Sequence, residues 1–153
     1  MIMLKRGDVA PLFTGVNQFG ELLSSNDFKG KKLIVFFYPK DNTPACNAEV
    51  RSLKEAYWLF EKHGFAIVGI NRDSIMSHKK FSDKFLLPFS LISDTDMKII
   101  DAFGVWGEKR QCNKIVNTIL RTTFIISEKG IIEHVITKVS SKDHATQILE
   151  LYL

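Results

Sequence analysis

Hydrophobic positions along the chain follow two patterns, which predict strands and helices in alternation. Continuous apolar runs at residues 33–37 and 65–70 are typical of buried strands. Between them, apolar residues recur at helical spacing from residue 44 to about 62, and Gly64 follows as a helix-ending residue. A strand, a helix and a second strand in this order form a parallel crossover unit.

Further elements precede and follow this unit. The same patterns predict an N-terminal hairpin at 13–16 and 21–23, a helical turn before residue 30, a helix over 74–85, a strand over 89–92, a short helix from residue 94 or 95 to 102, a loop over 104–114, a hairpin at 121–127 and 131–137, and a closing helix over 141–152. A βαβ unit followed by a ββα unit, with helices for both faces, predicts an α/β fold of thioredoxin-like layout, in which helices flank a central mixed β-sheet.

The junction between the first buried strand and the following helix is rich in helix-start residues. The apolar run ends at Tyr38, and Pro39-Lys40-Asp41-Asn42-Thr43-Pro44-Ala45-Cys46 follows. Asn42 or Thr43 can cap the helix, and Pro44 suits its first turn. Cys46 then lies within that turn, where backbone N–H groups lack intrahelical partners. The sequence therefore predicts a thiol at the positive end of a helix.

Helical geometry also predicts which way this thiol points. At about 100° per residue, a stripe roughly 80° wide contains Cys46, Val50, Leu53, Tyr57 and Phe60. Cys46 therefore faces the core, at the helix end that meets a strand terminus. We expect it in a recessed pocket that suits a small substrate.

Electrostatics at the helix start call for a second charged group. A cysteine reacts as its thiolate, and bringing a thiol from a pKa of about 8.5 to below about 7 requires about 2 kcal/mol. An exposed helix terminus contributes roughly 0.3 to 1 kcal/mol, so a fixed cation is needed as well. Arg121 is the candidate, because it opens an apolar strand that would otherwise exclude a charge. We expect the Arg121 guanidinium to contact Cys46.

Composition narrows the classes of protein without changing this picture. The 153 residues suit one domain over 1–153, and 45% hydrophobic with 25% charged residues is ordinary for a globular chain. The net charge of +4 comes from short, separated basic pairs, which we interpret as solvated surface rather than a nucleic-acid site. No run reaches membrane-spanning length and no signal-peptide core is found, so we expect a cytoplasmic protein without a membrane partner.

Metal and cofactor motifs are not found in the sequence. Cys46 and Cys112 are far apart and form neither a disulfide framework nor a paired metal motif. The histidines show no i, i+4 pair and no cysteine at zinc spacing, so we predict no metal site and expect surface positions for His63, His78, His134 and His144. No phosphate-binding glycine loop or dinucleotide fingerprint indicates a cofactor.

Several motifs, in the same order along the chain, resemble one family. Pro39-x-x-x-Thr43-x-x-Cys46 resembles the peroxidatic-cysteine motif of peroxiredoxins, and residues 36–44 resemble the bacterioferritin comigratory protein (peroxiredoxin Q) branch. Further segments similar to that branch are Gly7-Asp8-x-Ala10-Pro11-x-Phe13, Ser93-Asp94, residues 103–109 and Ile132-Glu133-His134-Val135. The resemblance runs nearly end to end and implies the thioredoxin-like fold with an added N-terminal β-hairpin.

The resemblance implies a thiol-dependent peroxidase that reduces hydrogen peroxide and organic hydroperoxides in antioxidant defence, without metal, haem or flavin. The Cys46 thiolate would attack the O–O bond while the Thr43 hydroxyl, the Cys46 backbone N–H and the Arg121 guanidinium stabilise the departing oxygen. Pro39 would shield the sulfur. Glu49, one turn after Cys46, can orient Arg121 through a carboxylate pair.

Each of these residues also has a structural interpretation without catalysis. An isolated helical cysteine is most often an inert small hydrophobic residue, and Thr43 can serve simply as a helix cap. Arg121 can form an interface or surface ion pair, and Glu49 can be a solvated helix charge. The motif around Cys46 favours the catalytic interpretation.

The sequence departs from the branch where a second cysteine is expected. Many members carry a resolving cysteine five residues after the peroxidatic one, where this chain has Arg51; others carry it on the next helix, where this chain has only serines as near substitutes. Cys112 can resolve a Cys46 sulfenic acid only if the two Cα atoms come within about 7 Å. We favour a one-cysteine mechanism with thioredoxin, glutaredoxin or a low-molecular-weight thiol as reductant, and keep Cys112 as the alternative.

Two other classes of function are compatible with the residues. A redox sensor would oxidise at Cys46 and bind a protein partner with little turnover, and a holdase-like protein would act by binding alone. Both predict slow loss of peroxide, whereas a peroxidase predicts repeated turnover with a suitable thiol. In either case we expect a monomer or a weak homodimer.

Overall fold

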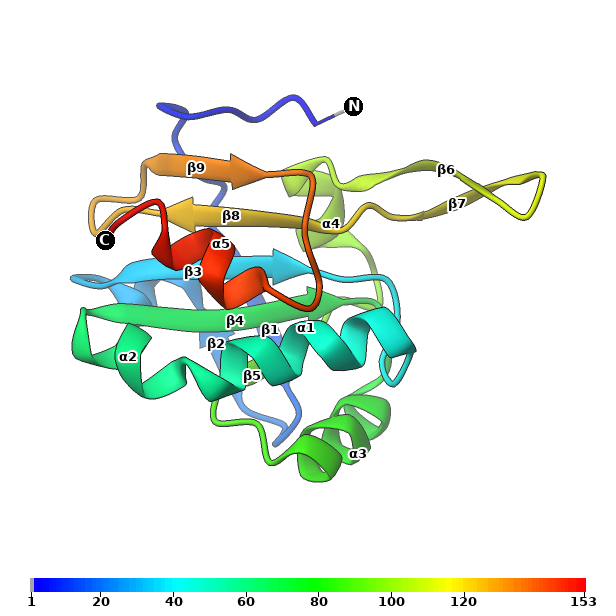
Figure 1. The fold of residues 1–153 in the computed structure, drawn as a ribbon, viewed down its shortest axis with the longest axis horizontal. Coiled ribbons are helices and arrows are strands. Elements are labelled where there is room, and N and C mark those ends of the chain that lie inside the picture. Colours follow the sequence, from blue (N-terminus) through cyan, green and yellow to red (C-terminus); the bar gives the residue numbers. More distant parts are fainter. Residues whose placement is uncertain (1) are drawn as a thin grey trace.

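The computed structural model describes residues 2–153, and its centre is a mixed sheet with the strand order β2-β1-β5-β4-β3-β8-β9 (Figure 1). The strands are β1 (Thr14–Asn17), β2 (Leu22–Ser24), β3 (Lys32–Phe37), β4 (Phe65–Asn71), β5 (Ser90–Ser93), β6 (Trp106–Gln111), β7 (Lys114–Ile119), β8 (Thr122–Ile126) and β9 (Ile132–Ile136). The helices are α1 (Pro44–Glu55), α2 (Tyr57–Lys62), α3 (Ile75–Phe85), α4 (Lys98–Phe103) and α5 (His144–Leu149), with a 3₁₀ turn, η1 (Ser25–Phe28).

The pairing of the strands follows the predicted crossover unit. β3 runs parallel to β4, and β4 runs parallel to β5, whereas β8 is antiparallel to β3 and pairs with β9. The predicted N-terminal hairpin is present as β1 and β2, and it extends the sheet because β1 pairs antiparallel with β5. The predicted α/β class with a central mixed sheet is therefore confirmed.

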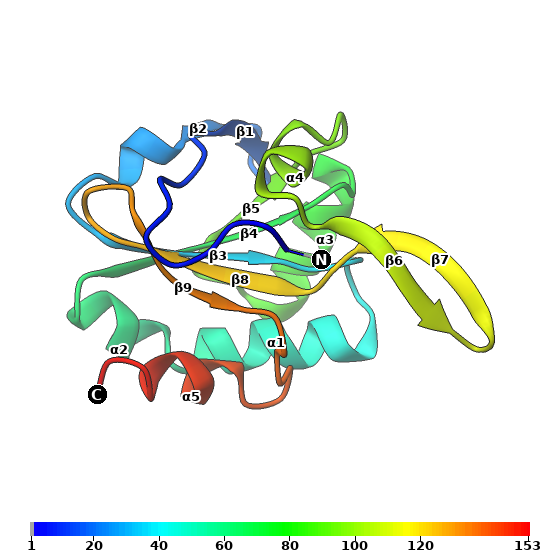
Figure 2. The same ribbon diagram turned by 90° about the horizontal axis from the view of Figure 1, so that it is seen from above.

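Alternate residues of each strand are buried on opposite faces of the sheet, because successive side chains in a strand point to opposite sides. In β3, Leu33, Val35 and Phe37 pack with α4 on one face, whereas the intervening Ile34 and Phe36 pack with α1, α2, α3 and α5 on the other. Seen from above, α1, α2 and α5 lie on one side of the sheet and α4 on the other (Figure 2). Cys46 belongs to the core of the α1 side.

The prediction of one continuous helix from residue 44 to about 62 is wrong at its middle. The helix breaks at Ala56, whose φ of −98° and ψ of 5° separate α1 from α2. No proline or glycine marks this position, so nothing in the local sequence indicates the break. After the bend, Phe60 packs edge-on against Phe65, with ring centroids 5.7 Å apart.

The predicted loop at 104–114 is also wrong, because most of it forms a two-stranded ribbon of β6 and β7. The ribbon projects away from the rest of the fold (Figure 1). Its turn is tight, with Cys112 and Asn113 at φ of 49° and 65°, the left-handed conformation that suits a two-residue hairpin turn. β6 carries consecutive exposed polar residues without the alternation of a half-buried strand, so the sequence pattern does not indicate a strand there.

Several helix ends and side-chain positions also differ from the predictions. The closing helix covers only His144–Leu149, and α4 begins at Lys98, where the Asp94 carboxylate accepts a hydrogen bond from the Ile100 N–H at 2.7 Å. Of the four histidines expected on the surface, His78 and His144 are fully buried. No helix among residues 2–153 combines the length and apolar character needed to cross a bilayer.

Candidate active site

Cys46 is the third residue of α1 and is completely buried. Thr43 is the N-cap residue, but its side chain makes no capping hydrogen bond, and its hydroxyl donates instead to the Lys40 carbonyl at 3.1 Å. The backbone carbonyl of Thr43 accepts from the Asn47 N–H at 2.8 Å and so starts the helical ladder. The thiol therefore lies at the positive end of a helix, as the sequence indicates.

Arg121 reaches this thiol from the neighbouring part of the sheet. It immediately precedes β8, and Thr122 of β8 pairs with Phe37 at the end of β3, so Arg121 lies beside the start of α1. Its Nη2 donates to the Cys46 Sγ at 3.3 Å, and its Nη1 donates to the Glu49 Oε1 at 2.6 Å. Both contacts are those expected from the sequence, and one guanidinium therefore joins a thiol and a carboxylate.

The charges at this point are strongly perturbed by burial. Glu49 is fully buried, and burial raises its pKa to about 7, although the Arg121 charge and hydrogen bond act in the opposite direction. Burial alone would lower the pKa of Arg121, but Glu49 and Cys46 outweigh it and raise that pKa above its usual value. The guanidinium therefore keeps its charge beside the sulfur.

His144 lies behind Glu49 and is a residue that sequence reasoning placed on the surface. Its Nε2 is 2.7 Å from the Thr123 Oγ1 and 3.6 Å from the Glu49 Oε2, which has no hydrogen-bond partner within residues 2–153. Its Nδ1 is 2.9 Å from the Gln147 Oε1. Burial lowers the pKa of His144 to about 4, so the ring is neutral near pH 7. The sequence does contain one indication that His144 is buried: it lies four residues before Ile148, a residue predicted to face inward, and so on the same face of the closing helix.

A cavity of about 560 Å³ leads to this group of residues. Its lining residues are Ile2, Pro39, Lys109, Ile119, Leu120, Arg121, Thr122 and Thr137. Cys46 is not among them, but Arg121, whose Nη2 contacts the Cys46 Sγ, is. A recess is present beside Arg121, but Cys46 is fully buried and does not line it, contrary to the expectation that the thiol itself lies in the pocket.

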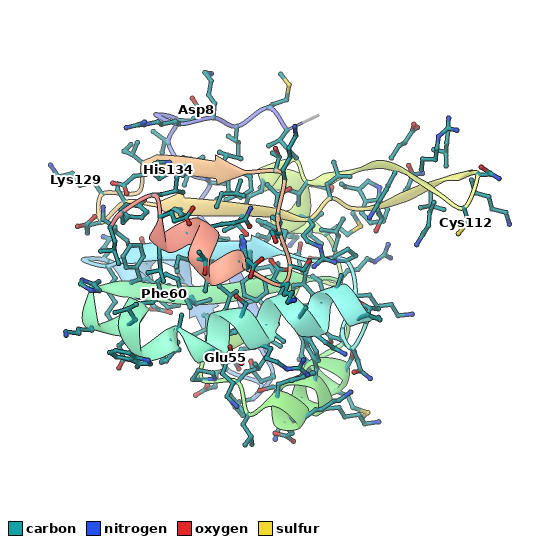
Figure 3. All side chains as sticks on the ribbon, viewed as in Figure 1. Asp8, Glu55, Phe60, Cys112, Lys129 and His134 are labelled. Atoms are coloured by element: carbon teal, nitrogen blue, oxygen red, sulfur yellow. The ribbon has the colours of Figure 1, made fainter. Side chains whose placement is uncertain are left out.

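Cys112 is not brought to this site. It is exposed at the tip of the β6–β7 ribbon (Figure 3), whereas Cys46 is buried. The ribbon returns to the body of the fold at the paired residues Trp106 and Ile119, and at about 3.3 Å per residue its tip lies roughly 20 Å from that point. Within residues 2–153, no group of three or more His, Cys, Asp or Glu side chains is placed to hold a metal ion.

Comparison with known proteins gives one consistent match. Residues 6–135 match the model of the AhpC/TSA family. The chain is 40% identical to a putative peroxiredoxin bcp of Coxiella burnetii, covering 94% of this chain and 95% of that protein, and 38% identical to peroxiredoxin Bcp of Escherichia coli, covering 95% and 94%. Among solved structures, a bacterioferritin comigratory protein of Xanthomonas campestris matches with a TM-score of 0.85 at 33% identity, covering 94% of this chain and 95% of that one. PrxQ of Xylella fastidiosa matches with a TM-score of 0.91 at 29% identity, covering 97% and 94%.

Proposed function

The chain belongs to the AhpC/TSA family as a peroxiredoxin of the Bcp/PrxQ type, a peroxidase of thioredoxin-like fold, and we propose that Cys46 is its peroxidatic nucleophile. The observation that carries this proposal is the 3.3 Å contact from the Arg121 Nη2 to the Cys46 Sγ at the start of α1. A guanidinium and a helix N-terminus both favour the thiolate over the thiol. We assign this activity to a single peroxiredoxin domain over residues 1–153.

In the proposed reaction the Cys46 thiolate attacks one oxygen of the peroxide. An S–O bond forms, the O–O bond breaks, and its electron pair leaves on the second oxygen, which takes up a proton to give water or an alcohol. The cysteine is left as a sulfenic acid. Arg121 and the Cys46 backbone N–H stabilise the negative charge on the departing oxygen, where fixed donors away from bulk water are most effective.

Three further residues have supporting roles in this proposal. Glu49 fixes the Arg121 guanidinium through the 2.6 Å contact, and we assign Pro39, which lines the cavity with Arg121, the role of shielding the sulfur. Thr43 is near enough along the chain to bind the peroxide, but its hydroxyl is engaged with the Lys40 carbonyl. Rotation about its Cα–Cβ bond would release that hydroxyl for the substrate.

Hydrogen peroxide and organic hydroperoxides are the proposed substrates. Support for organic substrates comes from the apolar side chains Ile2, Ile119 and Leu120 in the cavity wall. The Xanthomonas campestris relative is described by its alkyl peroxide reduction activity. We place the activity in antioxidant defence in the cytoplasm.

The proposed mechanism uses one cysteine and an external thiol. Arg51 occupies the position where many relatives carry a resolving cysteine, and Cys112 lies at the ribbon tip. Thioredoxin, glutaredoxin or a low-molecular-weight thiol would therefore reduce the sulfenic acid, and the protein would act as a monomer or a weak homodimer without a cofactor. A Cys46–Cys112 disulfide would require a large movement of the ribbon.

Rapid mixing with one equivalent of hydrogen peroxide tests the proposal. We expect fast thiol loss in wild type and in Cys112→Ser, none in Cys46→Ser, and a sulfenic acid detectable by mass. A Cys46–Cys112 disulfide in wild type would replace the one-cysteine mechanism with a two-cysteine one. Oxidation of Cys46 no faster than that of a free thiol would contradict the peroxidase role of this residue and favour a redox sensor.

A further inference from the structure

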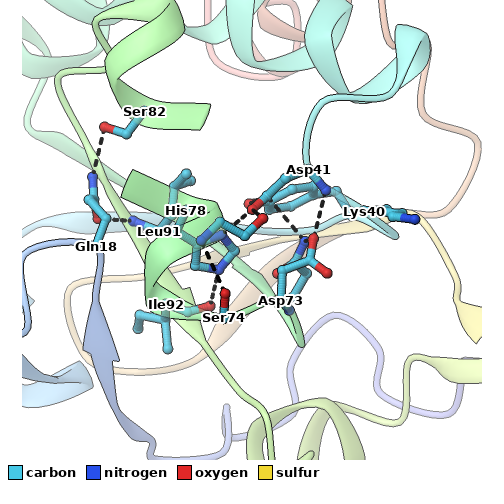
Figure 4. Close-up of polar contacts among 12 residues, drawn as sticks. Gln18, Lys40, Asp41, Asp73, Ser74, His78, Ser82, Leu91 and Ile92 are labelled. Atoms are coloured by element: carbon cyan, nitrogen blue, oxygen red, sulfur yellow. Dashed lines mark hydrogen bonds and ion pairs between the residues drawn. The ribbon is translucent and has the colours of Figure 1, made fainter. Parts of the chain in front are cut away.

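A second group of buried polar residues surrounds Asp41, in the loop that leads from β3 to Cys46. Figure 4 shows this group, to which the loop, the end of β4, α3 and β5 all contribute. Asp41 is 7% exposed and His78 is fully buried. None of the residues assigned a chemical role above belongs to this group, so its polar side chains require an explanation of their own.

The Asp41 carboxylate accepts four hydrogen bonds from protein groups. Its Oδ1 accepts from the Tyr38 hydroxyl at 2.7 Å and the Asn71 Nδ2 at 3.3 Å, and its Oδ2 accepts from the Ser77 hydroxyl and faces the His78 Nδ1, both at 2.7 Å. Burial acts to raise the pKa of Asp41, but His78 and the two hydroxyls outweigh it, and the pKa is lowered. The carboxylate is therefore ionised.

The partners of His78 require a charged ring. Its Nε2 lies 3.1 Å from the backbone carbonyl oxygen of Ile92, which can only accept, and its Nδ1 lies against the ionised Asp41. A neutral imidazole carries one N–H and can donate to only one of these two acceptors. Both contacts are satisfied when His78 is an imidazolium, so the group contains a buried ion pair.

This ion pair connects the loop to the centre of the sheet. Ile92 belongs to β5, so the chain of contacts runs from a central strand through His78 of α3 to Asp41. The loop is held at further points, because the Asp41 N–H donates to the Asp73 Oδ2 at 2.7 Å and the Lys84 Nζ donates to the Asn42 Oδ1 at 2.6 Å. Asn42 has a φ of 59°, a conformation that such contacts must maintain in a residue other than glycine.

We propose that Asp41 and His78 are positioning residues, whose buried ion pair holds the loop of residues 39–43 so that Pro39, Thr43 and the first turn of α1 place the Cys46 sulfur against Arg121. This inference rests on the proposed role of Cys46. Other titratable groups facing the pair are Tyr38, directly after β3, and Asp73, after β4, while Lys80 and Lys84 of α3 line a neighbouring cavity of about 400 Å³ together with Asp41. His78 is the cation that contacts the Asp41 carboxylate directly.

The first test is independent of catalysis. In protein carrying Cys46→Ser at about pH 7, ¹⁵N NMR of the histidine side chains should show both ring nitrogens of His78 protonated, because each of them faces an acceptor. The exposed His63, which lies outside this group, provides the internal reference. A singly protonated His78 ring at that pH would overturn the ion pair, whatever the activity of the wild-type protein.

The second test separates positioning from simple stability. In Asp41→Asn and His78→Gln, the rate constant for peroxide oxidation of Cys46, per folded molecule, should fall at least about tenfold, because small displacements of reacting groups are costly. Alkylation of Cys46 by a bulky maleimide should become faster in the same variants, because the loop no longer covers the sulfur. In the double variant Asp41→Asn/His78→Gln, the rate constant for oxidation should fall by no more than in the more affected single variant, because the two residues act as one pair.

The control for these variants is His63→Gln, which should leave both rates unchanged. If Asp41→Asn does not fold, Ser77→Ala removes one of the four donors to the carboxylate. Oxidation of Cys46 should then become about threefold slower, and its alkylation about threefold faster. Unchanged rates in folded variants would overturn the positioning role. Slow oxidation in wild type and variants alike would contradict the proposed function instead, while the NMR result would still decide the ion pair.

Discussion

Two buried pairs of a carboxylate and a histidine lie near the start of α1, and they behave in opposite ways. Asp41 and His78 approach to 2.7 Å, and the carboxylate accepts four hydrogen bonds. Glu49 and His144 approach only to 3.6 Å, and the Glu49 Oε2 has no hydrogen-bond partner among residues 2–153. The pKa of Asp41 is lowered despite its burial, whereas burial raises that of Glu49 to about 7 and lowers that of His144 to about 4.

The difference shows that burial alone does not determine the charge of such a pair. Desolvation acts against the charged form in both places, and the number of hydrogen bonds to the carboxylate decides the outcome. The Asp41 carboxylate is held in its ionised form by its hydrogen bonds, so this pair suits a structural anchor. The Glu49 pair is poised to change its protonation near neutral pH, beside the guanidinium that contacts the reactive sulfur.

The largest expected effect comes from matched amide substitutions in the two pairs. Asp41→Asn should lower the free energy of unfolding by about 3 to 5 kcal/mol, because it leaves the His78 imidazolium buried without its counter-charge. Glu49→Gln should cost less than about 1.5 kcal/mol at pH 7, because Glu49 is already partly protonated there. Urea unfolding of both variants measures the difference, and equal costs would contradict the assignment of an ion pair with histidine to Asp41 but not to Glu49.

The pH dependence of stability should separate Glu49 from His144. The folded pKa of Glu49, about 7, lies above the ordinary 4.5, so the folded state binds the extra proton and stability falls as pH rises from about 4.5 to 7, by roughly 3 kcal/mol. The folded pKa of His144, about 4, lies below the ordinary 6.5, so stability rises between about 4 and 6.5 by a similar amount.

The contributions of Glu49 and His144 to the pH dependence of stability nearly cancel in wild type. Each should become visible when the other residue is replaced. Glu49→Gln should gain stability as pH rises from about 4 to 6.5, and His144→Gln should lose stability from about 4.5 to 7. Urea midpoints measured across this range, with His63→Gln as the control, check the signs. Slopes of the same sign in the two variants would show that the pair does not have the assigned protonation states.

Arg121→Lys should affect activity more than stability. A lysine cannot donate to the Cys46 sulfur and the Glu49 carboxylate from two fixed N–H groups, so we expect kcat/KM for hydrogen peroxide to fall about 10²-fold, or about 2.7 kcal/mol. Arg110→Lys on the exposed ribbon is the matched control and should leave steady-state peroxide turnover unchanged. Near-normal turnover in Arg121→Lys would remove the guanidinium from the mechanism.

The smallest effect should come from the contact between Thr123 and His144, the histidine that lies beside Glu49. Thr123→Val removes the hydroxyl 2.7 Å from the His144 Nε2 while keeping the shape of the side chain. We expect a loss of about 1 kcal/mol in the free energy of unfolding, measured in urea at pH 7, and a change in kcat/KM of less than about threefold. A loss above about 3 kcal/mol would mean that this contact holds a charged His144.

The sequence was informative wherever local periodicity determined the structure. The stripe through Cys46, Val50 and Leu53 was correct, and Arg121 was found because a charge opening an apolar strand needs a partner. The burial of His78 was not predictable in this way. Its partners Asp41 and Ile92 come from distant segments, and only the folded sheet brings them together. The β6–β7 ribbon was missed because its exposed strands show no apolar face.

The break at Ala56 divides what would have been one helix into two separately anchored segments. α2 is held by Phe60 against Phe65, whereas the reactive first turn belongs to α1. Because the hydrogen-bond ladder is interrupted between them, α1 can fray toward Ala56 as a local cooperative unit without pulling Phe60 out of the core. The fold thereby separates the turn that carries Cys46, at the start of α1, from the aromatic contact that anchors α2.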